Sequence, residues 1–65
     1  MLFVNGKEVE YPGECTISQL LNRLGYRAER TAVERNGEIV PRKSLEHVAV
    51  VDGDHLEVVS FVGGG

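Results

Sequence analysis

The first apolar residues of the chain, Leu2–Val4, predict a short strand that ends where polar residues begin. Leu2–Val4 is followed by Asn5–Gly6, a dipeptide typical of two-residue hairpin turns because both turn positions need a positive φ. Residues 7–11 then alternate polar and apolar, and Pro12–Gly13 ends the run. We therefore predict a first β-hairpin over residues 2–11.

The spacing becomes helical after Thr16. Thr16 and Gln19 fit a capping box, in which each side chain bonds the backbone of the other residue. Arg23 in the last turn and Gly25 just beyond it are favourable at a helix C-terminus. We predict a helix of about three turns, which is too short to be stable unless it packs on a sheet. Its apolar face follows the i, i+3, i+4, i+7 pattern with Ile17, Leu20, Leu21 and Leu24.

A second hairpin is predicted where residues 31–35 and 38–40 flank Asn36–Gly37. Pro41 ends its second strand. Residues 42–47 are expected to form one helical turn anchored by Leu45.

Asp52–Gly53–Asp54 is a further turn, and residues 55–62 form the longest predicted strand. Two hairpins around one helix, with a closing strand, indicate an α+β fold with a mixed sheet and one helix packed on one face. This is the element order of the β-grasp, or ubiquitin-like, fold, in which the last strand lies in the middle of the sheet beside the first. We assign residues 1–62 to this domain and residues 63–65 to a flexible glycine tail.

The last strand predicts a surface for partners. Because side chains alternate along a strand, Leu56, Val58, Ser60 and Val62 share one face, while His55, Glu57, Val59 and Phe61 share the other. One helix covers only one side of the sheet. Val59 and Phe61 are then exposed near the tail, beside Val62 and joined by Phe3 on the neighbouring strand, and contiguous exposed apolar area marks interaction sites.

Composition excludes several classes of protein. Seven basic against ten acidic residues give a net charge of −3, which argues against nucleic acid as a partner. No apolar run approaches the roughly 20 residues of a membrane span, and we expect no signal peptide because the basic and apolar regions of one are not seen in the sequence. The single cysteine excludes an internal disulfide and favours a reducing cytoplasm. We expect a cytoplasmic protein that is a monomer when free.

The last three residues, Gly63, Gly64 and Gly65, have two interpretations. The first is a frayed end without a role. The second is an extended arm, reaching about 10 Å, that delivers a carboxylate into a narrow enzyme site. The second is favoured because the arm follows a buried strand without a linker and the domain offers no other chemical group.

Three segments of the chain are similar to a known family: residues 32–42, AVERNGEIVPR, the Asp52–Gly53–Asp54 turn, and the ending from Val62 to Gly65. In these segments the sequence resembles the ThiS-type sulfur carrier family. The Asn5–Gly6 turn and the Leu20–Leu21 helix also match, so the resemblance spans essentially the whole chain.

The resemblance implies a protein that is consumed and regenerated, and not an enzyme. An E1-like adenylating enzyme (ThiF type) would use ATP and Mg²⁺, bound to that partner and not to this chain, to adenylate the Gly65 carboxylate. A persulfide would then supply sulfur for a thiocarboxylate. Thiazole synthase (ThiG type) would use this sulfur to build the thiazole of thiamine.

Three alternatives stay open at this stage. The first is a sulfur carrier for molybdopterin or another metabolite, and the second is a ubiquitin-like modifier joined to target lysines through Gly65. The third is a β-grasp adaptor whose tail is inert. Deleting Gly64 and Gly65 distinguishes the adaptor, because only an adaptor keeps its activity.

Other reactive residues have simpler interpretations. Cys15 is expected to be a buried packing residue before the helix. His47 and His55 are expected on the surface, since their separation is no metal-ligand spacing, and Asp52–Gly53–Asp54 lacks the rest of a calcium loop. Charged side chains expected on the solvated surface are Glu8, Glu10, Glu14, Arg35, Arg42 and Lys43.

Overall fold

Residues 1–61 are described by a computed structural model, in which five strands form one mixed sheet in the order β2-β1-β5-β3-β4. Val62 and the predicted glycine tail 63–65 lie outside the described residues. The sheet comprises β1 (Leu2–Val4), β2 (Lys7–Val9), β3 (Thr31–Arg35), β4 (Glu38–Val40) and β5 (His55–Ser60).

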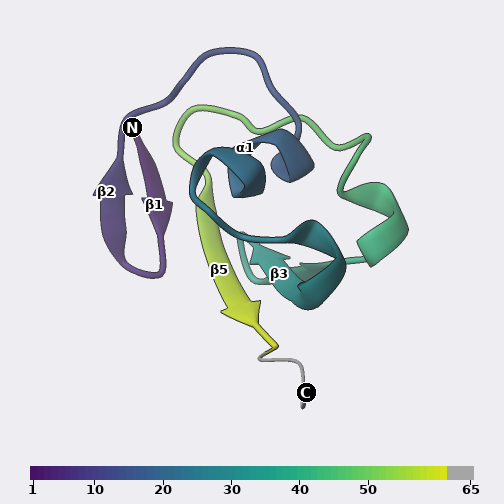
Figure 1. The fold of residues 1–65 in the computed structure, drawn as a ribbon. Helices are drawn as coiled ribbons and strands as arrows, with labels where there is room; N and C mark the ends of the chain where they lie inside the picture. The colour runs from purple at the N-terminus through teal and green to yellow at the C-terminus, as the bar shows by residue number, and fades with distance from the viewer. Residues whose placement is uncertain (62–65) are drawn as a thin grey trace.

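The last strand lies in the middle of the sheet, as predicted. β5 runs parallel to β1, with Phe3 opposite His55, and antiparallel to β3, with Val33 opposite Val58 (Figure 1). Within residues 1–61 there is one α-helix, α1 (Ile17–Arg23), and it lies over one side of this sheet (Figure 1). Its buried residues belong to the same apolar cluster as those of the strands. This is the β-grasp fold with one helix on a mixed sheet, and it confirms the predicted α+β class.

Both Asn-Gly hairpin turns form as predicted. Asn5 and Asn36 each have φ of 51°, and the glycines that follow them also have positive φ. Such values are uncommon outside glycine, and asparagine is among the residues that best tolerate them. The turns therefore set the register of both hairpins, with Val4 opposite Lys7 and Arg35 opposite Glu38.

The helix begins with the predicted capping box. The Gln19 backbone N–H donates to Thr16 Oγ1 at 3.1 Å, and the Thr16 N–H donates to Gln19 Oε1 at 2.9 Å. The helix is shorter than predicted, with seven residues. Because it ends at Arg23, Leu24 occupies the C-cap and is 37% exposed, so its predicted place on the buried face is wrong.

One layer of apolar side chains fills the space between α1 and the sheet. Leu45 after the 3₁₀ turn Arg42–Ser44 is 1% exposed, which confirms its predicted anchoring role. A further 3₁₀ turn, Ala28–Arg30, was not predicted. The buried apolar residues are Leu2, Val4, Cys15, Ile17, Leu20, Leu21, Val33, Leu45, Val50, Leu56 and Val58.

Candidate functional site

The strand that leads to the glycine tail is bonded to β3 along almost its whole length. The β3·β5 ladder continues to Thr31 opposite Ser60, and the Phe61 N–H then donates to the Arg30 carbonyl at 2.7 Å. Backbone hydrogen bonds therefore fix the chain up to the last described residue. The predicted strand over 55–62 is observed as His55–Ser60.

Two asparagine side chains also bind the central strand. Asn5 Oδ1 accepts from the Val58 N–H at 2.7 Å, and Asn5 Nδ2 donates to the Val58 carbonyl at 3.1 Å. On the other side, Asn36 Oδ1 accepts from the His55 N–H at 2.9 Å. Each turn residue thus supplies amide groups to β5 where the neighbouring strand turns away.

The sheet face opposite α1 is exposed at its tail end. Leu56 and Val58 are buried, whereas Val59 is 56% and Phe61 50% exposed, as the alternation predicts. Ser60, predicted with the core residues, is exposed because the buried layer on this strand ends at Val58.

Sequence reasoning missed two residues of this surface. Ile39 on β4 is 75% exposed, and Ala32 on β3 is exposed opposite Val59. The signal was the two-residue Asn36–Gly37 turn, because its register places Ile39 opposite Glu34 and hence on the open face. We call Ala32, Ile39, Val59 and Phe61 the open-face patch.

Phe3 lies elsewhere on the sheet. Its ring stacks on His55 with centroids 4.5 Å apart and an interplanar angle of 16°. His55 starts β5 and Phe61 follows its end, so about 20 Å separates them at roughly 3.3 Å per residue. The predicted contact of Phe3 with Val59 and Phe61 is therefore wrong, although Phe3 and His55 lie on the same face.

The turn at Asp52–Gly53–Asp54 forms as predicted, but Asp54 is more than a turn residue. Asp54 is 5% exposed, and Arg35 Nε donates to its Oδ2 at 3.0 Å. The Val51 N–H donates to the same oxygen at 2.8 Å, while Asn36 Nδ2 donates to Oδ1 at 3.0 Å. The prediction of Arg35 as an ordinary surface charge is thus wrong, because this side chain is half-buried and paired.

The environment of Asp54 holds its carboxylate ionised. Burial on its own raises the pKa of Asp54, but the hydrogen bonds from the Val51 N–H, Asn36 and Arg35, with the charge of Arg35, lower this pKa below its ordinary value. The carboxylate therefore connects the turn at residues 52–54 to the Asn36–Gly37 turn, and its contacts give it a structural role.

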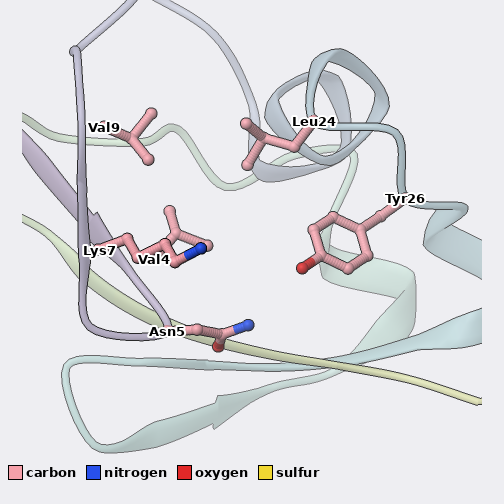
Figure 2. A pocket seen from close by; sticks show the side chains of 6 residues that line it. All are labelled: Val4, Asn5, Lys7, Val9, Leu24 and Tyr26. Atoms are coloured by element: carbon pink, nitrogen blue, oxygen red, sulfur yellow. The ribbon is translucent and has the colours of Figure 1, made fainter.

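A hollow lies on the helix side of the sheet, between the first hairpin and the end of α1 (Figure 2). Tyr26 and Leu24 border it opposite Val4 and Val9 (Figure 2). Its volume is about 240 Å³. This is below the roughly 300 Å³ at which ligand pockets begin. The amide of Asn5, at its edge, is already bonded to Val58. The hollow therefore brings together no set of groups for catalysis.

The remaining candidates keep their simple interpretations. Cys15 is free and 7% exposed within the core, as predicted. His47 and His55 are exposed. No group of three or more side chains within residues 1–61 is placed to hold a metal ion. In the same part of the chain, no helix has the length and apolar character needed to cross a membrane.

Several proteins with known names are similar to this chain in sequence. The sulfur carrier protein ThiS of Bacillus subtilis is 39% identical over 66 residues, covering 100% of both chains. A thiazole synthase of Paramagnetospirillum magneticum is 50% identical over 64 residues, 98% of this chain and 20% of that protein. A thiazole synthase of Magnetococcus marinus is 38% identical, again over 20% of its length, so the chain spans about a fifth of these two relatives.

A solved structure is also similar to this chain. The crystal structure of the thiamine biosynthesis protein ThiS from Geobacter metallireducens matches with a TM-score of 0.79 and 39% identity, over 98% of this chain and 97% of that one. The model of the ThiS family matches residues 2–65, nearly the full sequence. The chain therefore belongs to the ThiS family.

Proposed function

We propose that this protein is a sulfur carrier of thiamine biosynthesis that carries its sulfur on Gly65. The observation that supports this most is the extent of the family match, because it covers residues 2–65 and so includes all three terminal glycines. The Bacillus relative named as a sulfur carrier is matched over its whole length. In this proposal the protein is a co-substrate and not a catalyst.

Activation has to come first, because a carboxylate is a poor electrophile. In the proposed sequence, the Gly65 carboxylate attacks the α-phosphorus of ATP on an E1-like adenylating enzyme, forming an acyl-adenylate and releasing pyrophosphate. A persulfide sulfur displaces AMP, and a thiol cleaves the resulting acyl disulfide to leave a thiocarboxylate. ATP and Mg²⁺ are bound by the partner throughout.

The fold suits this role because its central strand leads to the tail. Backbone bonds hold β5 and Phe61 to the end of the described chain, so a partner that binds the sheet face also holds the segment that precedes the tail in the sequence. The open-face patch, with Val59 and Phe61 nearest the tail, is the surface we propose for binding the adenylating enzyme and then the sulfur acceptor.

Thiazole synthase is the acceptor that we propose. In two relatives, a segment similar to this chain occurs within a longer protein named thiazole synthase. Segments that share one polypeptide act at high effective concentration on each other. This supports transfer of the sulfur to an enzyme of that class.

The experiment is an intact-mass measurement. The protein is incubated with an E1-like adenylating enzyme, MgATP, a persulfide source and a thiol. We expect a mass gain equal to replacing one oxygen by sulfur, located at Gly65 by fragmentation, and loss of that gain when thiazole synthase and its substrates are added. An unchanged mass with active adenylating enzyme would contradict the proposal.

A further inference from the structure

Two carboxylates oppose each other on the uncovered face of the sheet. Glu34 on β3 pairs directly with Glu57 on β5, and both residues are exposed. Like charges at directly opposed positions of an antiparallel pair are destabilising. Within residues 1–61, the ion pairs join Met1 to Asp52 and Arg35 to Asp54, so neither glutamate is neutralised there. The free domain therefore carries an unfavourable charge pair.

A hollow of about 120 Å³ lies at this pair. Apart from the two glutamates its lining is apolar, with Ile39 and Val59 of the open-face patch among its residues. The hollow is well below the roughly 300 Å³ at which metabolite pockets begin. Its size therefore suits a single side chain of another protein.

We infer that this hollow receives an arginine side chain of the partner enzyme, with the guanidinium between Glu34 and Glu57 and the aliphatic stem against Ile39 and Val59. Arginine combines an apolar stem with a planar group of five donors, and it is weakly hydrated for a cation. It is also enriched among the residues that dominate interface energies. The inference rests on the proposed function only for the choice of partner enzymes.

Other occupants fit this chemistry less well. A second copy of the chain packed symmetrically through this face would present the same glutamates, and so would bring acidic groups together. A metal ion would find two carboxylates, and no group of three potential ligands occurs within the described residues. A cationic side chain is the occupant that neutralises both charges and fills the apolar walls.

The test compares two double variants of equal charge change. In E34Q/E57Q both carboxylates of the hollow become amides. In the control, E10Q/E46Q, two exposed glutamates away from the hollow change in the same way. Calorimetric titration gives Kd for the E1-like adenylating enzyme and for thiazole synthase, each at low and high salt, and thermal unfolding reports stability.

We expect E34Q/E57Q to raise Kd about 30-fold for at least one enzyme, with loss of most of the salt dependence, while the control stays within twofold of the unmodified protein. Because the charge pair is unfavourable in the free domain, the melting temperature of E34Q/E57Q should be equal or higher. Surface arginines of that enzyme are then replaced by alanine one at a time. One of these substitutions should raise Kd for the unmodified protein but leave Kd for E34Q/E57Q unchanged.

Three results would overturn the inference. The first is a Kd within twofold of the unmodified protein for both enzymes. The second is tight binding of Mn²⁺ to the free protein that E34Q/E57Q abolishes while enzyme affinity is unchanged. The third is a dimer in sedimentation that E34Q/E57Q dissociates. If thiocarboxylate still forms normally in any of these cases, the proposed function stands and only the arginine site fails.

Discussion

Arg35 and Asp54 join the second hairpin to the turn that starts β5, through a bond of 3.0 Å between Nε and Oδ2. Asp54 also accepts from the Val51 N–H and from Asn36, so both of its oxygens are occupied. This carboxylate is nearly fully buried, at 5% exposure. The beginning of the strand that leads to the glycine tail is therefore fixed by one ionised group.

Acid should weaken this arrangement. Because folding lowers the pKa of Asp54 below its ordinary value of 3.8, the stabilisation is fully present above that value and is lost as the pH falls through the lower folded-state pKa. We expect Asp54→Asn to lower the free energy of unfolding at pH 7 by about 1–3 kcal/mol. The NH₂ group of the new side chain would face N–H donors that now bond to the carboxylate. Urea denaturation between pH 7 and pH 2 measures both effects.

The control for this experiment is Glu46→Gln, which changes an exposed carboxylate by the same chemistry. Its stability should follow that of the unmodified protein across the pH range. If Asp54→Asn loses stability between pH 4 and pH 2 as steeply as the unmodified protein does, Asp54 is not the group that gives the acid dependence.

The side chain of Asn5 should contribute to stability beyond its turn. Asn5→Gly keeps a residue that tolerates the observed φ of 51°, but it removes both bonds to Val58. We expect a loss of about 1–3 kcal/mol in thermal or urea unfolding, because the Val58 N–H and carbonyl lose their partners. The exposed neighbour variant Lys7→Ala is the comparison, and equal stability of the two would show that the amide contacts are not stabilising.

How far the sequence predicts this structure depends on the range of the interactions. The hairpins, the capping box and the alternation of β5 depend on residues close in sequence, such as Asn36–Gly37 and Thr16 with Gln19, and they were predicted. Asp54 and Asn36 lie 18 positions apart, and no local pattern shows that a buried acid will pair there. The prediction that Leu24 is buried was wrong for another reason. Helical spacing does not reveal where a helix ends, and α1 ends before Leu24.

The candidate site was predictable in part for the same reason. Alternation along one strand indicated Val59 and Phe61, and these residues are exposed. Ile39 and the Glu34–Glu57 pair required the register between three strands, of which only the β3–β4 hairpin is set by a local turn. The position of Phe3 at the far end of β5 follows from the parallel β1–β5 pairing, which no turn specifies.

Truncating the open-face patch should weaken partner binding without affecting folding. We expect Phe61→Ala and Ile39→Ala each to raise Kd about 30-fold for the adenylating enzyme or for thiazole synthase, because side chains at the centre of an interface carry most of its binding energy. Because both side chains are half or more exposed, stability should change by only about 0.5 kcal/mol. Calorimetric titration and thermal unfolding of the same samples separate the two effects.

Leu24→Ala is the matched control for the patch. Leu24 is also an exposed apolar residue, at 37%, but it lies at the end of α1 on the other side of the sheet. Its substitution should leave both affinities within twofold. Equal loss of affinity in Leu24→Ala and Phe61→Ala would mean that binding does not distinguish the two sides of the sheet.

Shortening the chain by Gly64 and Gly65 should separate carrying sulfur from folding. The shortened chain keeps every core residue described within residues 1–61 and the whole β3·β5 ladder, so we expect unchanged unfolding temperature and unchanged binding through the open-face patch. Formation of the thiocarboxylate should be abolished, because the carboxylate then belongs to Gly63 and the reach of the chain is reduced by two residues, at most about 7 Å. Intact mass after incubation with the adenylating enzyme measures the loss, and sulfur still acquired by the shortened chain would place the carrier group elsewhere.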